Sequence, residues 1–173
     1  RQIWRSKDGF DWTLVSDSPS WSERAGAATV VFDNKLWILG GKEDHYYGDS
    51  TSLKNDVWYS EDGEDWKLAT NNAPWPARAY HQAVVLGGKI YLMGGGNYRP
   101  TYRAFNDVWS SKNGKDWIRE TNSAPWSERL WFSAVKFHHH IFVVGGWADD
   151  PSRNLGDIWY SKDGINWNQL KTQ

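Results

Sequence analysis

The sequence has no cysteine and a single methionine among its 173 residues. The absence of cysteine excludes disulfide bonds, zinc sites built from thiolates and cysteine nucleophiles. Neither sign of charge is in excess, because 20 Lys and Arg stand against 21 Asp and Glu. No apolar run approaches the length that spans a bilayer. We therefore expect no nucleic acid partner and no membrane insertion. The first residues also lack the charged and apolar segments of a secretory signal peptide. A secreted chain from which the signal has been removed would lack them too.

Tryptophan, in contrast, is abundant, with 14 residues in the chain. Most of these belong to recurring phrases. One phrase reads NDVWYSEDGEDW at 55–66 and returns as NDVWSSKNGKDW at 106–117, GDIWYSKDGINW at 156–167 and, in clipped form, QIWRSKDGFDW at 2–12. A catalytic motif is normally needed once, so four copies indicate a structural repeat.

A second pattern lies between the phrases. A Trp is followed three residues later by an Arg, then by two apolar stretches joined by a tight turn, and then by a glycine pair. The Trp and Arg residues are Trp21 and Arg24, Trp75 and Arg78, and Trp126 and Arg129; the glycine pairs are Gly40-Gly41, Gly94-Gly95 and Gly145-Gly146. Because the same rings recur in each unit, we expect most of the Trp residues to be core residues.

Each unit predicts four short β-strands, because its segments are rich in Val, Ile, Leu and aromatic residues and none is long or periodic enough for a helix. In the second full unit they are HQAVVL, KIYLMG, DVWSS and WIRET. Gly87-Gly88 joins the first two as a hairpin, and the turn inside the phrase joins the last two. Such units at a period of about 50 residues are typical of an all-β fold, the β-propeller. We assign a half blade to 1–20 and blades to approximately 21–71, 72–122 and 123–173.

The glycine pair, the variable loop after it, the NDVW segment and the later Trp together resemble the kelch repeat over almost the whole chain. This resemblance implies a kelch-type, galactose-oxidase-like β-propeller. The segment S-x-D-G-x-x-W at 60–66 also resembles the Asp-box hairpin of sialidase-like propellers, one residue shorter, which in those families is a folding element away from the active site. Some kelch-fold enzymes use a Tyr-Cys copper cofactor, which a cysteine-free chain cannot form, and we expect no cofactor. Trp-rich propellers of this kind also resemble bacterial extracytoplasmic proteins.

The strand count predicts an incomplete ring. The chain begins with the third and fourth strands of a blade and continues with three complete blades, whereas closed propellers have about four to eight. Exposed strand edges and blade faces invite association. We therefore expect other polypeptide to complete the ring, either in a homo-oligomer or in the remainder of a longer chain.

The long loops between the second and third strands of the blades are the candidate binding surface, since they share one face of the propeller and differ between units. They read KEDHYYGDSTSLK at 42–54, GNYRPTYRAF at 96–105 and WADDPSRNL at 147–155. Such a mixture of aromatic, Arg and acidic side chains is frequent at protein interfaces. The candidate residues are His45, Tyr46, Tyr47, Tyr98, Arg99, Tyr102, Arg103, Trp147, Asp149 and Arg153. Near the start of innermost strands, Tyr80, His81 and Trp131 either line the mouth of the channel or fill space.

Arg24, Arg78 and Arg129 have two interpretations. Three convergent guanidinium groups can clamp a carboxylate, as an arginine cluster does in sialidases. Their shared repeat position favours a structural role instead. The run His138 to His140 falls in a hairpin turn, where we expect only adventitious metal binding.

We predict a non-enzymatic recognition module that binds a protein or a glycan through these loops. Two alternatives stay open: a sialidase-like or other enzyme that processes a sugar acid with an Arg cluster, and an excised or engineered propeller fragment with no activity of its own. An enzyme requires a deep pocket in which an Arg meets a carboxylate or a tyrosine of shifted pKa. A recognition module requires an aromatic surface without such a group.

Overall fold

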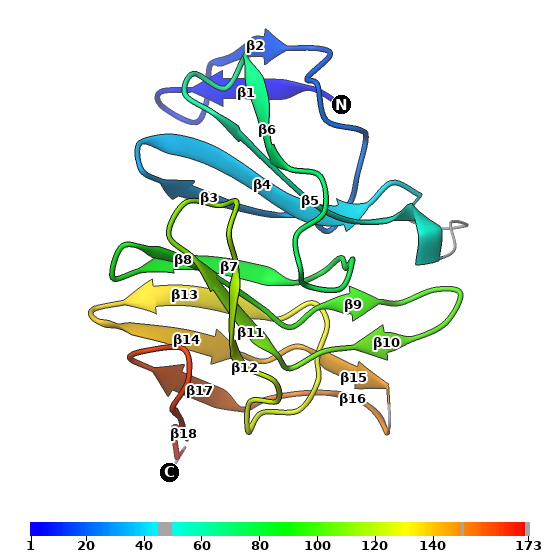
Figure 1. Ribbon diagram of the computed structural model, residues 1–173, viewed down its shortest axis with the longest axis vertical. Coiled ribbons are helices and arrows are strands. Elements are labelled where there is room, and N and C mark those ends of the chain that lie inside the picture. The colour runs from blue at the N-terminus through cyan, green and yellow to red at the C-terminus, as the bar shows by residue number, and fades with distance from the viewer. Residues whose placement is uncertain (45–49, 150, 172–173) are drawn as a thin grey trace.

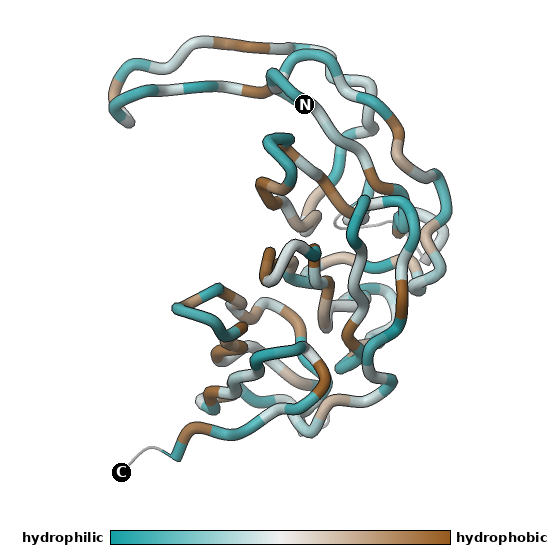
Figure 2. Tube along the Cα trace, turned by 60° about the vertical axis from the view of Figure 1, so that its left-hand side comes forward, coloured by the Kyte–Doolittle hydropathy of each residue, from teal (hydrophilic) through white to brown (hydrophobic). Residues whose placement is uncertain are grey.

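The computed structural model describes residues 1–44, 50–149 and 151–171. These residues form a two-stranded half blade followed by three four-stranded antiparallel blades, stacked in chain order (Figure 1). Turned by 60° (Figure 2), the trace follows an open arc that carries the two termini at its opposite ends. The predicted all-β propeller architecture is confirmed. No helix in the described part of the chain has the length and apolar character that a membrane span needs.

Each full blade is a meander of consecutive strands. The half blade comprises β1 (Ile3–Ser6) and β2 (Trp12–Ser16). The first full blade comprises β3 (Ala28–Phe32), β4 (Lys35–Lys42), β5 (Leu53–Ser60) and β6 (Trp66–Thr70), with a 3-10 turn at Ser50–Ser52. The second comprises β7 (Gln82–Leu86), β8 (Lys89–Met93), β11 (Val108–Ser111) and β12 (Ile118–Thr121). The third comprises β13 (Ser133–Phe137), β14 (His140–Val144), β17 (Ile158–Ser161) and β18 (Trp167–Gln169).

The first strand of each blade is the innermost one. Strand β7 packs against β3 on one side and β13 on the other, so these three strands line the axis. Two-residue turns connect them to the second strands, with Phe32 paired to Lys35 and Leu86 paired to Lys89. Both residues of each turn have positive φ, which is why Gly87-Gly88 and Asp33-Asn34 occupy them.

Paired indole rings fill each full blade. Trp21 meets Trp66, Trp75 meets Trp117 and Trp126 meets Trp167, all edge to face with ring centroids 5.9 to 6.0 Å apart. The second and third pairs are buried, with Trp75 and Trp126 at 0% and 1% exposure. In the half blade, by contrast, Trp4 and Trp12 are 47% and 58% exposed. The expectation that repeat Trp residues are core therefore holds for these two pairs and is wrong for the half blade, whose sheet has only two strands.

Successive blades are joined by the recurring phrase. Its Asn reaches the next blade, since the Asn106 side-chain amide donates to the carbonyl oxygens of Ala124 and Trp126 at 2.9 and 3.1 Å. Its glycine packs closely against a ring of the preceding blade, since a Cβ added at Gly114 would overlap the Trp37 indole. The phrase is therefore the connector between blades as well as a turn.

Candidate functional site

The long connections of the second and third blades contain pairs of short antiparallel strands. Strands β9 (Gly96–Asn97) and β10 (Arg103–Ala104) form one, and β15 (Trp147–Asp149) and β16 (Ser152–Asn154) form the other. Both project from the same side of the blades, opposite the β7–β8 turn (Figure 1). We call them the hairpin rim. The predicted candidates His45, Tyr46 and Tyr47 lie outside the described residues.

Five aromatic rings meet where the two rim hairpins adjoin the inner strands. Trp147 is central: its ring centroid lies 5.5 Å from Tyr98, 5.4 Å from Tyr102 and 5.5 Å from Trp131. Trp131 also contacts Tyr98 at 4.8 Å and Tyr80 at 5.3 Å. These five residues form the rim cluster, which packs the β9–β10 hairpin onto the third blade. All five are among the candidates predicted from the sequence, and the structure brings them together.

Two members of the rim cluster have a strained backbone. Tyr80 and Trp131 have φ values of 59° and 52°, a region that bulky residues rarely occupy, while the equivalent residue in the first blade is Gly26 with φ 65°. Such strain costs roughly 1 to 3 kcal/mol per residue and concentrates at functional sites. The Tyr80 ring is 7% exposed, whereas Trp131 remains 47% exposed. The Trp131 indole is therefore the member of the cluster most open to a ligand.

Two tyrosines of the rim cluster, Tyr80 and Tyr102, are neutral contact groups. Burial raises the pKa of Tyr80 above its ordinary value of 10.0, and burial likewise raises the pKa of Tyr102. A raised pKa disfavours the phenolate that a nucleophilic tyrosine requires. The chemistry of these two residues is thus hydrophobic contact and hydrogen bonding.

Three exposed arginines surround the rim cluster. Arg99 lies over the Tyr98 ring at 5.1 Å and Arg103 lies over the Phe105 ring at 4.8 Å, while Arg153 stands on β16. Within residues 1–44, 50–149 and 151–171 none of the three forms an ion pair. Asp149, on β15, is also exposed. The rim therefore presents guanidinium groups whose charge is not compensated within the described structure.

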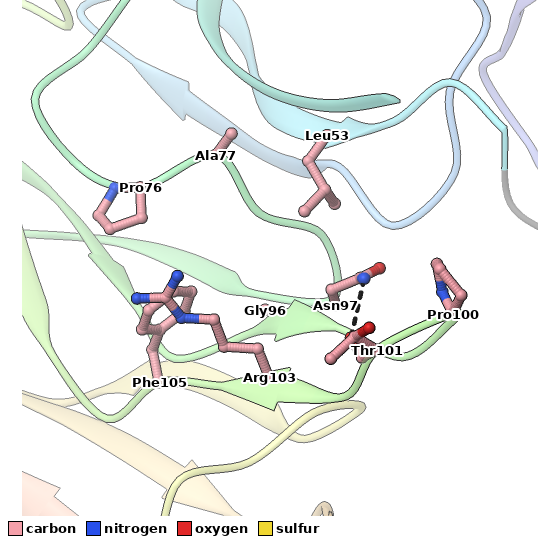
Figure 3. A pocket seen from close by; sticks show the side chains of 9 residues that line it. All are labelled: Leu53, Pro76, Ala77, Gly96, Asn97, Pro100, Thr101, Arg103 and Phe105. Atoms are coloured by element: carbon pink, nitrogen blue, oxygen red, sulfur yellow. Dashed lines mark hydrogen bonds between the residues drawn. The ribbon is translucent and has the colours of Figure 1, made fainter. Parts of the chain in front are cut away.

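A cleft of about 510 Å³ lies beside the β9–β10 hairpin, on the side facing the first blade (Figure 3). Pro76, Ala77 and Leu53 line it opposite the hairpin, and the hairpin contributes Pro100 and Arg103. Of these, only Arg103 is among the candidates predicted from the sequence. The lining residues come from three separate segments of the chain. The sequence of each segment is typical of an ordinary turn or strand end, so it gives no sign of a cleft.

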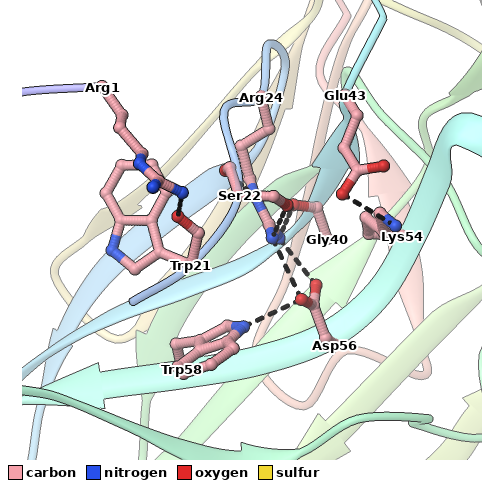
Figure 4. A network of polar contacts seen from close by, with 9 residues as sticks. All are labelled: Arg1, Trp21, Ser22, Arg24, Gly40, Glu43, Lys54, Asp56 and Trp58. Atoms are coloured by element: carbon pink, nitrogen blue, oxygen red, sulfur yellow. Dashed lines mark hydrogen bonds and ion pairs between the residues drawn. The ribbon is translucent and has the colours of Figure 1, made fainter. Parts of the chain in front are cut away.

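The repeat arginines lie within the scaffold. Arg24 (Figure 4) donates to both carboxylate oxygens of Asp56 at 2.6 and 3.0 Å and to the Gly40 carbonyl oxygen at 2.9 Å. Arg78 and Arg129 make the same bonds to Asp107 and Asp157 of their own blades. All three guanidinium side chains are at most 1% exposed.

The aspartates of these pairs also accept a bond from the phrase. The Trp159 indole N–H donates to Asp157 at 2.7 Å, and the corresponding Trp58 and Trp109 do the same in their blades. Burial acts to raise the pKa of Asp157, but the bonds from Arg129 and Trp159 outweigh it and hold the pKa below its ordinary value. Arginine, aspartate and indole thus form one repeated structural unit, which leaves no convergent clamp.

His81 is fully buried, and within the part of the chain that the structure describes neither ring nitrogen forms a well-aligned hydrogen bond, although the Leu39 backbone interacts with the ring. Burial lowers its pKa to about 3, and the neighbouring Arg78 charge acts in the same direction, so the imidazole is neutral. The ring lies 6.1 Å from Trp75, in the position that Phe132 occupies against Trp126 in the next blade. It fills space between blades rather than lining an open channel.

The histidine run lies on the opposite face from the rim. His138 and His139 are exposed in the β13–β14 turn, and His140 packs 5.6 Å from the Tyr160 ring. Among the described residues no group of three or more His, Asp or Glu side chains is placed to hold a metal ion.

Comparison with known proteins finds similarity to kelch proteins. The kelch motif profile matches residues 77–110. Human Kelch-like protein 6 is 30% identical over 77% of this chain, and an N-acetylneuraminate epimerase from Pasteurella multocida (strain Pm70) is 24% identical over 64% of it. The solved structure of YjhT superposes with a TM-score of 0.73 at 19% identity, covering 93% of this chain and 55% of its own. The chain spans 19% of the length of Kelch-like protein 6 and 29% of that of the epimerase.

Proposed function

We propose that this chain, a kelch-type β-propeller segment, is a recognition module that binds a partner protein through the hairpin rim. One observation carries the proposal: the aromatic rim cluster holds two hairpins in place, and these hairpins display Arg99, Arg103 and Arg153 without ion pairs among the described residues. Aromatic and arginine side chains supply most of the binding energy at protein interfaces. Kelch propellers typically serve as protein-interaction modules, which agrees with this assignment.

A protein partner fits the rim better than a glycan does. Sugars stack on free aromatic faces, but the rings of the rim cluster are packed against one another at 4.8 to 5.5 Å. Trp131 alone among them is more than one third exposed. Guanidinium groups suit a partner that carries carboxylates, which proteins supply in any sequence.

A peptide display selection against the purified chain tests this function, with a glycan array as a parallel arm. Arg99→Gln and Arg153→Gln remove rim contacts without touching the core, while Trp131→Gly removes the most exposed ring of the rim cluster and introduces the residue that the first blade has at this position. Each should weaken the selected peptides at least tenfold. Lys112→Gln and Lys162→Gln, on turns at the opposite face, are the controls and should bind normally. If the selected peptides bind all the rim variants with the same affinity as the original chain, the binding site does not lie on the rim.

The second candidate is an enzyme acting on a sugar acid, which the similarity to an N-acetylneuraminate epimerase favours. The buried Arg–Asp pairs do not supply its clamp, and burial raises the pKa values of Tyr80 and Tyr102. Proton NMR of N-acetylneuraminate with and without the chain tests it. Accelerated epimerisation that Trp131→Gly abolishes would make the rim an active site and displace the recognition function.

We also infer that further polypeptide covers the outer face of the third blade. Val84 and Tyr91 of the second blade are buried against the third, at 5% exposure each. Val135, in the position of Val84, is 51% exposed, and the neighbouring Phe137 is 58% exposed. At the other end, Gly9 of the half blade has no ring against it, whereas Gly114 and Gly164 each cover one. A second copy of the chain, or the remainder of a longer one, supplies the complementary surface.

A further inference from the structure

We propose that the cleft between the β9–β10 hairpin and the segment before β7 binds an extended peptide in which a carboxylate side chain adjoins an apolar one. The inference rests on the proposed recognition function and specifies the chemistry of the partner. Three features of the cleft carry it: an available guanidinium group, an apolar lining and a hairpin that is held in place from both sides.

Arg103 provides the charge. Its guanidinium group lies 4.8 Å from the centroid of the Phe105 ring, and the buried Arg78 lies at 4.1 Å from the same ring (Figure 3 shows Arg103 over Phe105). Arg78 forms an ion pair with Asp107, whereas Arg103 has no carboxylate partner among the described residues. Stacking fixes the plane of the Arg103 guanidinium and leaves its N–H edge available for bidentate bonds to a carboxylate.

The rest of the cleft suits apolar side chains. Leu53, Pro76 and Ala77 face the hairpin from the first blade and the connecting segment, and Pro100 closes the end near the hairpin tip. The volume, about 510 Å³, falls in the usual range of roughly 300 to 1,000 Å³ for ligand sites. A carboxylate on Arg103 would therefore lie beside a site where an apolar side chain is removed from water.

The hairpin wall is fixed before any partner arrives. From the first blade, the Lys42 ammonium group donates to the Asn97 side-chain oxygen at 3.1 Å and to the Arg99 carbonyl oxygen at 2.5 Å. Asn97 in turn donates to the Thr101 carbonyl oxygen at 3.0 Å. On its other side the hairpin is packed by the rim cluster. A preformed wall lowers the entropic cost of binding.

The charges around the cleft favour an anionic partner. Residues 96–105 contain Arg99 and Arg103 and no acidic residue, and residues 72–81 contain none either. Two carboxylates near these segments are already engaged, Asp107 with Arg78 and Glu43 with Lys54. One stacked guanidinium matches the single charge of a carboxylate, whereas a phosphate dianion is usually held by an arginine cluster. This selects Asp or Glu over a phosphorylated side chain.

Titration of the ¹⁵N-labelled chain with the peptide acetyl-Ala-Leu-Glu-Leu-Ala-amide tests the inference by NMR. Saturable shifts are expected at the backbone amides of Leu53, Ala77, Gly96 and Thr101. The same peptide with Gln in place of Glu should bind at least tenfold more weakly, and one with phosphoserine there should not bind better. Arg103→Gln should cost at least tenfold in affinity for the Glu peptide. Arg119→Gln is the matched control, because Arg119 also stacks on an aromatic ring, Trp109 at 5.5 Å, but lies outside the cleft.

Equal binding of the Glu and Gln peptides, or Arg103→Gln binding like Arg119→Gln, would overturn the carboxylate assignment. Shifts confined to residues outside the cleft would overturn the site, and preference for phosphoserine would replace carboxylate by phosphate. These failures are separable from the proposed function. If the Glu peptide leaves the cleft unshifted while Arg99→Gln and Trp131→Gly still lose selected peptides, the rim recognises its partner elsewhere.

Discussion

Trp12, Trp66, Trp117 and Trp167 occupy one repeat position, yet Trp12 is 58% exposed while Trp117 and Trp167 are 8% and 9% exposed. The local chemistry is the same in all four, because each indole N–H donates to the carbonyl of the glycine three residues before it, at 3.0 to 3.2 Å. The difference is the partner ring, since Trp117 meets Trp75 edge to face. Burial at this position therefore depends on the blade and not on the phrase.

Trp117→Ala should lower the free energy of unfolding by about 3 to 5 kcal/mol, the usual cost of deleting a buried large aromatic. Trp12→Ala, at the equivalent exposed position, should cost less than about 1 kcal/mol. Denaturant titrations of the two variants measure both values. Similar losses at the two positions would show that the half blade is as tightly packed as the second blade.

His81 is a buried polar ring in a position that the next blade fills with Phe132. A buried group without hydrogen bonds costs roughly 1 to 3 kcal/mol. His81→Phe should therefore raise the free energy of unfolding at pH 7 by a comparable amount. Thermal or chemical unfolding measures it, and His139→Phe in the exposed turn is the control. Destabilisation by His81→Phe would mean that the larger ring does not fit between Trp75 and Gly40.

The pH dependence gives a second measure of the same residue. The pKa of His81 is about 3 in the folded chain, below its ordinary value of 6.5, so the unfolded chain binds a proton that the folded chain does not. Stability should fall as the pH drops from 6.5 towards 3, by about 1.4 kcal/mol per pH unit. The difference between the original chain and His81→Phe isolates this loss. Parallel acid profiles of the two proteins would contradict a neutral buried imidazole.

At the level of secondary-structure elements, the turn of each phrase is also a contact surface. Gly114 lies against the Trp37 indole of the preceding blade and Gly164 lies against Tyr91. Gly88, in the β7–β8 turn, has the same φ of +71° as Gly114, but a Cβ added there would meet no atom within 4 Å. Substitutions at the two glycines therefore distinguish the cost of a positive φ from the cost of a steric clash between blades.

Gly88→Ala should cost about 1 kcal/mol, because only the backbone conformation is penalised. Gly114→Ala should cost at least about 2 kcal/mol more, since its Cβ would also overlap the Trp37 ring. Unfolding titrations of the two variants give the difference directly. If both lose the same stability, the hairpin can move away from the preceding blade without penalty, and the glycine is needed for its φ alone.

At the scale of the whole molecule, the exposed face of the third blade predicts association. Light scattering should show that the average mass of the chain rises with concentration, because Val135 and Phe137 are exposed whereas their counterparts in the second blade, Val84 and Leu86, are buried against the third blade. Val135→Lys should shift the chain towards the monomer, and Lys136→Gln beside it should not. A monomer that stays unchanged up to high concentration would show that the face tolerates solvent and that no second copy covers it.

The strands of the blades, their hairpin turns and the propeller architecture could be predicted from the sequence, whereas the short strands β9, β10, β15 and β16 lie in segments that were expected to be loops. These features depend on short windows of the chain, in which Gly87-Gly88, the Asp-Gly turns and alternating apolar residues act locally. The position of the rim followed as well, because a meander places its second connections on one side. The kelch resemblance is likewise supported by the motif match and the structural superposition.

Tertiary structure decided which side chains meet. Each repeat Arg pairs with an Asp 28 to 32 residues further on, a partner that no local pattern identifies. The rim cluster gathers residues from two hairpins and from the segments just before two inner strands, and the cleft beside it combines Leu53, Pro76 and Arg103 from three segments. Such contacts depend on how one blade is rotated against the next, and that rotation follows from the packing of the whole interface. The repeat thus determined the scaffold, whereas the packing between blades determined which groups are free to bind.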